Sequence, residues 1–152
     1  MLKHINPILS PDLLHALRQM GHGDEIAIVD ANFPAYSQGP RVVRLDGIDA
    51  TRALDAILSV LPLDEFTPEA CWRMQVVGAP DEEMPVFAEF RDIIARREGA
   101  HFTLASLERY AFYARTAKCF AVVATSERRL YGNIILKMGI VKAPTAGGGA
   151  SA

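Results

Sequence analysis

The sequence predicts a single α/β domain with three layers, in which helices cover both faces of a largely buried central sheet. The chain has 152 residues, of which 50% are hydrophobic, and this is enough to bury one sizeable core. Short continuous apolar runs bounded by polar residues are typical of strands that are covered on both faces. Stretches with apolar residues at helical spacing alternate with these runs, which is the order expected of a layered α/β domain.

The first helix is predicted to begin after Ser10. Serine commonly caps a helix N-terminus, and Pro11 suits the first helical position, where its missing N–H has no partner to lose. Gly21 is expected to end this helix in a left-handed conformation, and residues 26–29 then predict a buried strand. The apolar positions at helical spacing are Leu13, Leu14, Leu17 and Met20.

The middle of the chain is expected to contain a loop, two strands and a helix. Residues 31–40 are rich in turn-forming residues and predict a loop, and residues 42–45 are a second strand candidate. Residues 51–61 place apolar side chains on one helical stripe before Pro62, so they predict a helix. Residues 72–77 are a third strand candidate.

The C-terminal half predicts two more helices and two more strands. One helix runs from about Val86 and ends before Gly99, and the other covers residues 110–118. Residues 104–107 are ambiguous. The last two strands are expected at residues 120–124 and 133–137.

The end of the chain differs in composition from the rest. Residues 142–152 are mostly small or turn-forming and have too little apolar surface to order themselves. We therefore expect a domain over residues 1–141 and a flexible tail over residues 142–152.

The charge composition argues against a nucleic-acid partner. The chain has 16 Lys and Arg against 18 Asp and Glu, a formal net charge of -2, whereas nucleic-acid binding calls for a basic excess. No apolar run approaches the roughly 20 residues of a membrane span, and the N-terminus shows no secretory signal, so a cytoplasmic protein without membrane contact is expected. Cys71 and Cys119 are expected to be free buried thiols.

Several kinds of site are excluded because their motifs are missing. The sequence contains neither GxGxxG nor a Walker A motif for nucleotide phosphates, and no GxSxG nucleophile elbow. The four histidines show no metal-ligand spacing, so no metal is expected.

His22 is the first candidate for acid–base chemistry. It lies between Gly21 and Gly23, which leave the imidazole unshielded, and its ordinary pKa of about 6.5 suits proton transfer near neutrality. The alternative is a turn histidine that caps a helix C-terminus.

Asp30 is the second candidate, because it directly follows the predicted strand at residues 26–29 and ligands of open α/β sheets bind beyond the carboxyl ends of strands. Its carboxylate would accept sugar hydroxyls or take a proton. The alternative is a loop cap for the amides of Asn32 and Phe33.

Residues 108–115 are the third candidate, since a helix would place Arg109 one turn from Tyr113 and offer a cation beside aromatic faces that suit sugars. The alternative is that Phe112 belongs to the core and that Arg109 and Arg115 are solvated or ion-paired. Residues 131–133, a phenol and an amide around a glycine, either bind a ligand or define a turn.

Taken together, these segments resemble the L-fucose mutarotase and D-ribose pyranase family. They occur in the family's order over nearly the whole chain. The L-fucose mutarotase branch fits better, because the pyranase branch has histidine at the position of Arg109 and a basic residue at that of Tyr113. The matching segments are residues 9–14, 20–26, 30–35, 109–115, 120–125 and 131–137.

The resemblance implies an isomerase that interconverts the α and β anomers of a free monosaccharide, with L-fucose as the expected sugar and without any cofactor. It implies that His22 is the proton donor, and we expect Tyr113 or Tyr131 to assist it at the anomeric hydroxyl. The sugar-binding residues that it implies are Asp30, Arg109, Tyr131, Gly132 and Asn133, with Asp64 and Met74 as further pocket residues.

Two positions depart from the family pattern. Ala114 stands where a glutamate is usual, and Ser126 stands where the family has the glycine of a Thr-Gly-Glu turn. The resemblance also implies a homo-oligomer, either a decameric ring or a dimer, with sites near the subunit contacts of the rings.

Two other functions are compatible with the same residues. The first is an accessory protein of a fucose or ribose transport or utilisation system, in which the same pocket would bind sugar without exchanging its anomers. A purely structural or interaction domain would have no affinity for free sugars.

Overall fold

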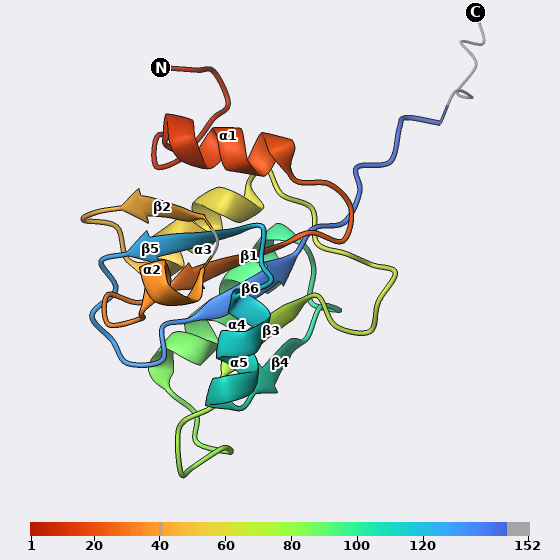
Figure 1. The fold of residues 1–152 in the computed structure, drawn as a ribbon. Helices are drawn as coiled ribbons and strands as arrows, with labels where there is room; N and C mark the ends of the chain where they lie inside the picture. Colours follow the sequence, from red (N-terminus) through yellow and green to blue (C-terminus); the bar gives the residue numbers. More distant parts are fainter. Residues whose placement is uncertain (40, 146–152) are drawn as a thin grey trace, which may run out of the picture.

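The computed structural model describes residues 1–39 and 41–145 and contains a six-stranded sheet with the strand order β2-β5-β1-β6-β3-β4 (Figure 1). The strands are β1 (Glu25–Val29), β2 (Val42–Leu45), β3 (Cys71–Met74), β4 (Leu104–Leu107), β5 (Ala121–Thr125) and β6 (Ile134–Lys137).

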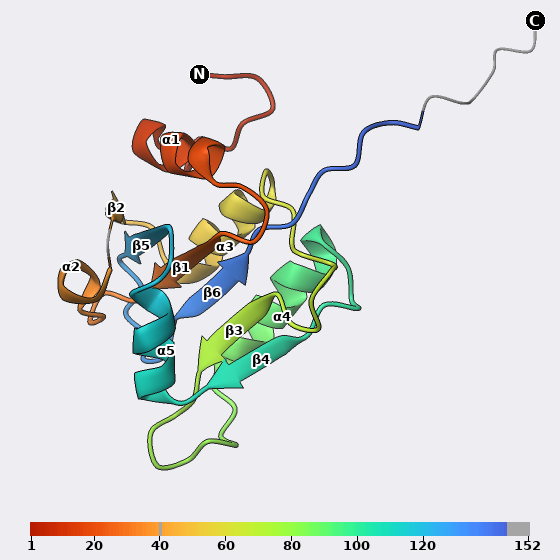
Figure 2. The same ribbon diagram turned by 45° about the vertical axis from the view of Figure 1, so that its right-hand side comes forward.

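Helices cover both faces of this sheet, which confirms the predicted α/β layers. Figure 2 shows α3 and α4 on one side of the strands and α2 and α5 on the other. Ile26 and Ile28 of β1 belong to the core beneath α1, α3 and α4, whereas Ala27 and Val29 belong to the core beneath α2 and α5. The helices are α1 (Pro11–Gln19), α2 (Ala35–Gln38), α3 (Ala50–Leu58), α4 (Pro85–Arg97) and α5 (Arg109–Thr116).

The direction of β6 decides which residues meet at each end of the sheet. β1 pairs parallel to β5 and antiparallel to β6, and its register joins Glu25 to Lys137 and Ile28 to Ile134. The start of β6 therefore lies beside the carboxyl end of β1, and the end of β6 lies beside the start of β1. Polar residues that flank these two strands are brought together at both ends.

The first helix begins as predicted but ends differently. The Ser10 hydroxyl accepts a hydrogen bond from the N–H of Leu13 at 3.2 Å, and Pro11 is the first helical residue. The prediction that Gly21 ends the helix in a left-handed conformation is wrong. Met20 takes an extended conformation and is buried, and Gly23 is the glycine with a positive φ, 89°.

Two boundaries in the middle of the chain also differ from the prediction. The loop expected over residues 31–40 contains the short helix α2. The helix expected over residues 51–61 begins at Ala50, because Asp49 caps it, and ends at Leu58. It ends early because the following N–H groups bond three residues back, which tightens the last turn.

The third strand is shorter than predicted, and the ambiguous segment is a strand. β3 ends at Met74 because Val76 and Ala79 pair across a tight turn in which Gly78 has a φ of 78°. Residues 104–107 form the edge strand β4, parallel to β3.

The described residues bear on three other expectations. No helix among them is long and apolar enough to cross a membrane. Cys71 and Cys119 are free and buried, as predicted. Most of the predicted tail, residues 146–152, lies outside the described residues.

Candidate active site

A pocket of about 160 Å³ lies beyond the carboxyl end of β1. Its walls come from the loop after β1, the end of β3, the first turns of α5 and the turn before β6. Six residues predicted for the site line it together, although they come from four parts of the chain: Asp30, Met74, Arg109, Tyr113, Tyr131 and Asn133.

Asp30 and Asn133 form the polar floor of this pocket. The Asn133 amide donates to Asp30 Oδ2 at 2.8 Å, and the backbone N–H of Asp30 donates to Asn133 Oδ1 at 2.8 Å. Asp30 Oδ1 also accepts the N–H of Asn32 at 2.9 Å, so the expected loop-capping role is present as well. Burial raises the pKa of Asp30, although these N–H donors oppose the rise. Both side chains are thereby held in one orientation before any ligand binds.

Arg109 and Tyr113 come from the first two turns of α5. Glu108 caps this helix by accepting the N–H of Tyr110 at 2.8 Å, which places Arg109 at its first position. The Arg109 guanidinium lies 4.7 Å from the ring centroid of Tyr110, and its Nη2 donates to the Tyr110 hydroxyl at 2.8 Å. Its Nε is buried and has no partner among the described residues. Arg109 therefore keeps donor capacity at the edge of the pocket.

Tyr113 and Phe33 form an aromatic wall. Their ring centroids are 5.3 Å apart and the rings meet edge to face. Phe112, in contrast, is fully buried in the core, and Arg115 forms a bidentate ion pair with Glu25, so these two residues follow the structural alternative of the sequence analysis.

Tyr131 approaches the pocket from the turn before β6. It has a φ of 64°, a left-handed conformation that is uncommon for a residue with a side chain. Its hydroxyl accepts the N–H of Val77 at 3.1 Å, which leaves the phenol proton free to be donated. Gly132 is not among the residues that line the pocket. A Cβ at Gly132 would lie 2.6 Å from Cγ of Glu127, so the close packing of this turn requires glycine.

Four lining residues were missed by the sequence analysis: Asn32, Phe33, Val77 and Leu130. Val77 and Leu130 are exposed apolar side chains at the pocket rim. No local pattern marks them, because exposed apolar residues are common on protein surfaces. Asn32 and Phe33 lie next to Asp30 in the sequence, and that proximity was the one available signal.

His22 is placed elsewhere, at the opposite end of β1. Its Nε2 lies 3.1 Å from Asp64 Oδ1, and its side chain is 48% exposed whereas that of Asp64 is 1% exposed. The ring packs against Phe66 at a centroid distance of 5.4 Å. Asp64 therefore belongs to the surroundings of His22 and not to the pocket of its own chain.

Strand β1 separates His22 from Asp30. His22 precedes the five residues of β1 and Asp30 follows them, and a strand rises about 3.3 Å per residue. About 16 Å of strand thus lies between the two residues. The structure brings the predicted site residues into two groups, with the sugar-orienting side chains in one and the imidazole in the other.

The comparison with known proteins decides the family. A sequence profile described as the RbsD / FucU transport protein family matches residues 3–141. The chain belongs to the RbsD/FucU family. This confirms the resemblance found in the sequence, and it covers the helices and strands described above.

Relatives in this family carry informative names. Fucose mutarotase of Homo sapiens is 45% identical over 146 residues, which is 92% of this chain and 94% of that protein. The fucose mutarotase of Streptococcus pneumoniae, solved in complex with L-fucose, is 41% identical with a TM-score of 0.84, and the match covers 93% of this chain and 100% of that one. Bacillus subtilis RbsD, solved with D-ribose, is 22% identical over 93% of this chain and 100% of that one, with a TM-score of 0.72, so it supports the fold alone.

The structure accommodates both departures from the RbsD/FucU pattern. Ser126 is not among the residues with a positive φ, and its hydroxyl accepts the N–H of Gly47 at 2.7 Å. Ala114 is exposed on the outer side of α5 and does not line the pocket beyond β1. Neither departure therefore disturbs the candidate site.

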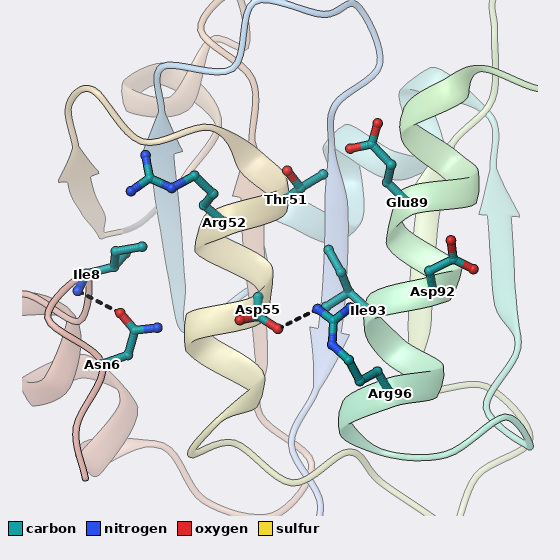
Figure 3. A pocket seen from close by; sticks show the side chains of 9 residues that line it. All are labelled: Asn6, Ile8, Thr51, Arg52, Asp55, Glu89, Asp92, Ile93 and Arg96. Carbon is teal, nitrogen blue, oxygen red and sulfur yellow. Dashed lines mark hydrogen bonds and ion pairs between the residues drawn. The ribbon is translucent and has the colours of Figure 1, made fainter.

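A larger groove of about 460 Å³ lies between α3 and α4 (Figure 3), but it is not the candidate site. Asp55 accepts hydrogen bonds from Arg97 and Arg96 there, and these lower its pKa to about 2. None of the predicted site residues lines this groove. Two of the charged residues that line the groove, Asp55 and Arg96, are paired with each other. Among the described residues, no group of His, Cys, Asp and Glu could hold a metal ion.

Proposed function

We propose that this protein is a fucose mutarotase, an isomerase that interconverts the α and β anomers of L-fucose. The observation that carries the proposal is the pocket beyond β1, where Asp30 and Asn133 are buried and hydrogen-bonded beside the aromatic wall of Tyr113 and Phe33. Buried, pre-oriented polar groups beside apolar faces suit the hydroxyls and C–H faces of a sugar. The 45% identity to human fucose mutarotase supports this sugar.

The reaction needs two proton transfers and no redox change. Protonation of the ring oxygen and loss of the anomeric hydroxyl proton open the ring to the aldehyde, and the exposed carbonyl rotates before the ring closes again. Positioned acid–base groups accelerate such steps by about 100- to 10,000-fold. We assign His22 as the acid at the ring oxygen and Tyr131 or Tyr113 as the assisting group. Asp30, Arg109 and Asn133 hold the sugar hydroxyls.

A single chain does not bring all these groups together, so we also propose that the site is shared between two copies. His22 is half-exposed and lies about one strand length from Asp30. In a homo-oligomer, His22 of a second copy would face the pocket of the first. A head-to-tail contact of this kind closes into a ring, whereas a two-fold contact gives a dimer. Sedimentation velocity distinguishes the decamer from the dimer, and a monomer with full activity would refute the shared site.

Anomer exchange of L-fucose, measured by saturation-difference NMR, tests the activity. We expect the protein to raise the exchange rate above the spontaneous background, and His22→Ala to abolish most of that increase. An exchange rate that stays at background with the wild-type protein would end the enzyme proposal.

One observation favours a second candidate, a non-catalytic sugar-binding accessory protein: polar and aromatic side chains line the pocket of one chain, but no histidine is among them. Calorimetric binding of L-fucose without accelerated exchange would support this function over the isomerase.

We further propose that the protein acts in the cytoplasm. Two buried free thiols, Cys71 and Cys119, fit a reducing compartment. Cell fractionation with an antibody against the chain would test this location.

A further inference from the structure

Asp64 is a buried acid outside the sugar pocket that makes contacts through both its backbone and its side chain. Its backbone N–H donates to the carbonyl of Lys137 at 3.1 Å, which ties it to the end of β6. Its Oδ1 accepts the N–H of Phe66 at 3.1 Å, and its Oδ2 accepts the Thr67 hydroxyl at 3.1 Å. The position of the carboxylate is therefore fixed by both its backbone and its side chain.

Two charged or chargeable side chains of the same chain also contact the Asp64 carboxylate. The Lys137 ammonium lies 3.5 Å from Oδ2, and His22 Nε2 lies 3.1 Å from Oδ1. Burial opposes ionisation of Asp64, but the hydrogen bonds from Phe66, His22 and Thr67 outweigh it and lower the pKa of the carboxyl. At neutral pH Asp64 is an acceptor.

The Asp64 carboxylate, which accepts a hydrogen bond from His22 Nε2, decides which ring nitrogen of His22 carries the proton. A carboxylate cannot donate, so Nε2 must carry a hydrogen in both the neutral and the charged ring. The lone pair of neutral His22 is then on Nδ1, and the second proton binds there. The ring is also held by Phe66, whose centroid lies 5.4 Å away.

We propose that Asp64 is a positioning residue that holds His22 in its Nε2–H form, so that Nδ1 is the atom that gives the proton to the sugar and takes it back. This inference rests on the proposed mutarotase function. On ring opening the Nδ1 proton moves to the ring oxygen as the bond from that oxygen to the anomeric carbon breaks. The anomeric hydroxyl proton leaves through the assisting tyrosine to water, and ring closure reverses both transfers. The Asp64 side chain is 1% exposed, so it acts through His22.

The tautomer is tested first, without any measurement of activity. Nitrogen chemical shifts of 15N-histidine in the wild-type protein, assigned to His22 with the His22→Ala variant, are expected to show a protonated Nε2 and an unprotonated Nδ1 in the neutral ring. A neutral ring protonated on Nδ1 would overturn the inference even if the protein is an active mutarotase. Conversely, a protein without exchange activity would refute the proposed function and leave this shift pattern intact.

The kinetic test uses Asp64→Asn, whose amide can turn its N–H₂ toward Nε2 and so favour the wrong tautomer. We expect the exchange rate at saturating L-fucose to fall by about 10- to 100-fold while sugar affinity is unchanged, as for other residues that orient a reacting group. The double variant with His22→Ala should be no slower than His22→Ala alone. A loss of affinity with an unchanged saturated rate would instead assign Asp64 to sugar binding.

Two further variants control for folding. Glu65→Gln removes a neighbouring carboxylate that is exposed, and it should leave the exchange rate unchanged. Thr67→Val removes one support of Asp64 and should lower the rate less than Asp64→Asn does, with an unchanged melting temperature.

The pH profile of the exchange rate provides a further test. The charged groups near His22 that can influence it are Asp64, Lys137 and Asp24 of the same turn. Because His22 gives its proton from the charged ring, loss of the Asp64 carboxylate should move the alkaline arm of this profile to lower pH, and an unmoved arm would count against the contact.

Discussion

Asn133 and Asp30 hold each other by two hydrogen bonds of 2.8 Å, although 103 positions separate them in the sequence. One bond joins the two side chains, and the other runs from the Asp30 backbone to the Asn133 side chain. The antiparallel pairing of β1 and β6 makes this contact possible, because it sets the start of one strand beside the end of the other.

Asn133→Ala should destabilise the protein and weaken L-fucose binding. The substitution leaves Oδ2 of the buried Asp30 and the Asp30 backbone N–H without the partners that Asn133 provides, which costs about 1–3 kcal/mol. Urea unfolding measures the free energy of unfolding, and calorimetry measures the affinity. Gln75→Ala is the matched control, because its amide bond to Ser106 is exposed and should contribute only tenths of a kcal/mol. Equal losses in both variants would contradict the role given to the pair.

Tyr131→Phe should slow anomer exchange more than Tyr113→Phe does. The Tyr131 hydroxyl is oriented by the N–H of Val77 at 3.1 Å, so its proton has a defined direction, whereas the contacts that place Tyr113 are aromatic. A positioned acid–base group is worth about 100-fold or more. Saturation-difference NMR on the two variants decides which tyrosine assists, and a larger loss in Tyr113→Phe would reverse the assignment.

Asp55→Asn should remove part of the stability of the protein above pH 4. The hydrogen bonds from Arg97 and Arg96 lower the pKa of Asp55 to about 2. A carboxyl with a lowered pKa in the folded state stabilises the protein fully above its ordinary value of about 3.9, and this contribution is lost as the pH falls through about 2.

Because Asp55 is partly exposed, we expect a difference of about 1–2 kcal/mol between wild type and variant at pH 7, shrinking to none in strong acid. Urea unfolding from pH 2 to pH 7 provides the measurement. Asp92→Asn lies in the same groove and forms no ion pair among the described residues, so it should change stability little at any pH. A pH-independent effect of Asp55→Asn would contradict the ion-pair explanation.

Mixing two inactive variants should restore activity if the site is shared between copies. His22→Ala retains an intact pocket and Asp30→Asn retains an intact histidine. Random mixing in an oligomer places the two intact halves together in about a quarter of the sites. The exchange rate of the remixed sample, compared with each variant alone, tests this. Recovery near that fraction is expected, and no recovery after verified subunit exchange would place both residues in one chain's site.

Much of the fold follows from local sequence patterns. The continuous apolar run at residues 26–29 predicts a strand that is buried on both faces, and β1 is buried in that way. Ser10 and Pro11 predict the start of α1 correctly. Boundaries were less accurate where a turn competes with the pattern, as at Gly78 after β3, because apolar spacing reports burial and does not report where hydrogen bonding stops.

By itself, the sequence determined the α/β class, the RbsD/FucU membership and six of the side chains that line the pocket, among them Asp30 and Asn133 of its floor. Only the tertiary structure decided that Asp30 pairs with Asn133 and that His22 pairs with Asp64 at the other end of β1. Spacing along the chain determines which residues share a helix or a strand. Which ends of two strands lie together depends on their direction in the sheet, and that is set by packing between segments far apart in the sequence.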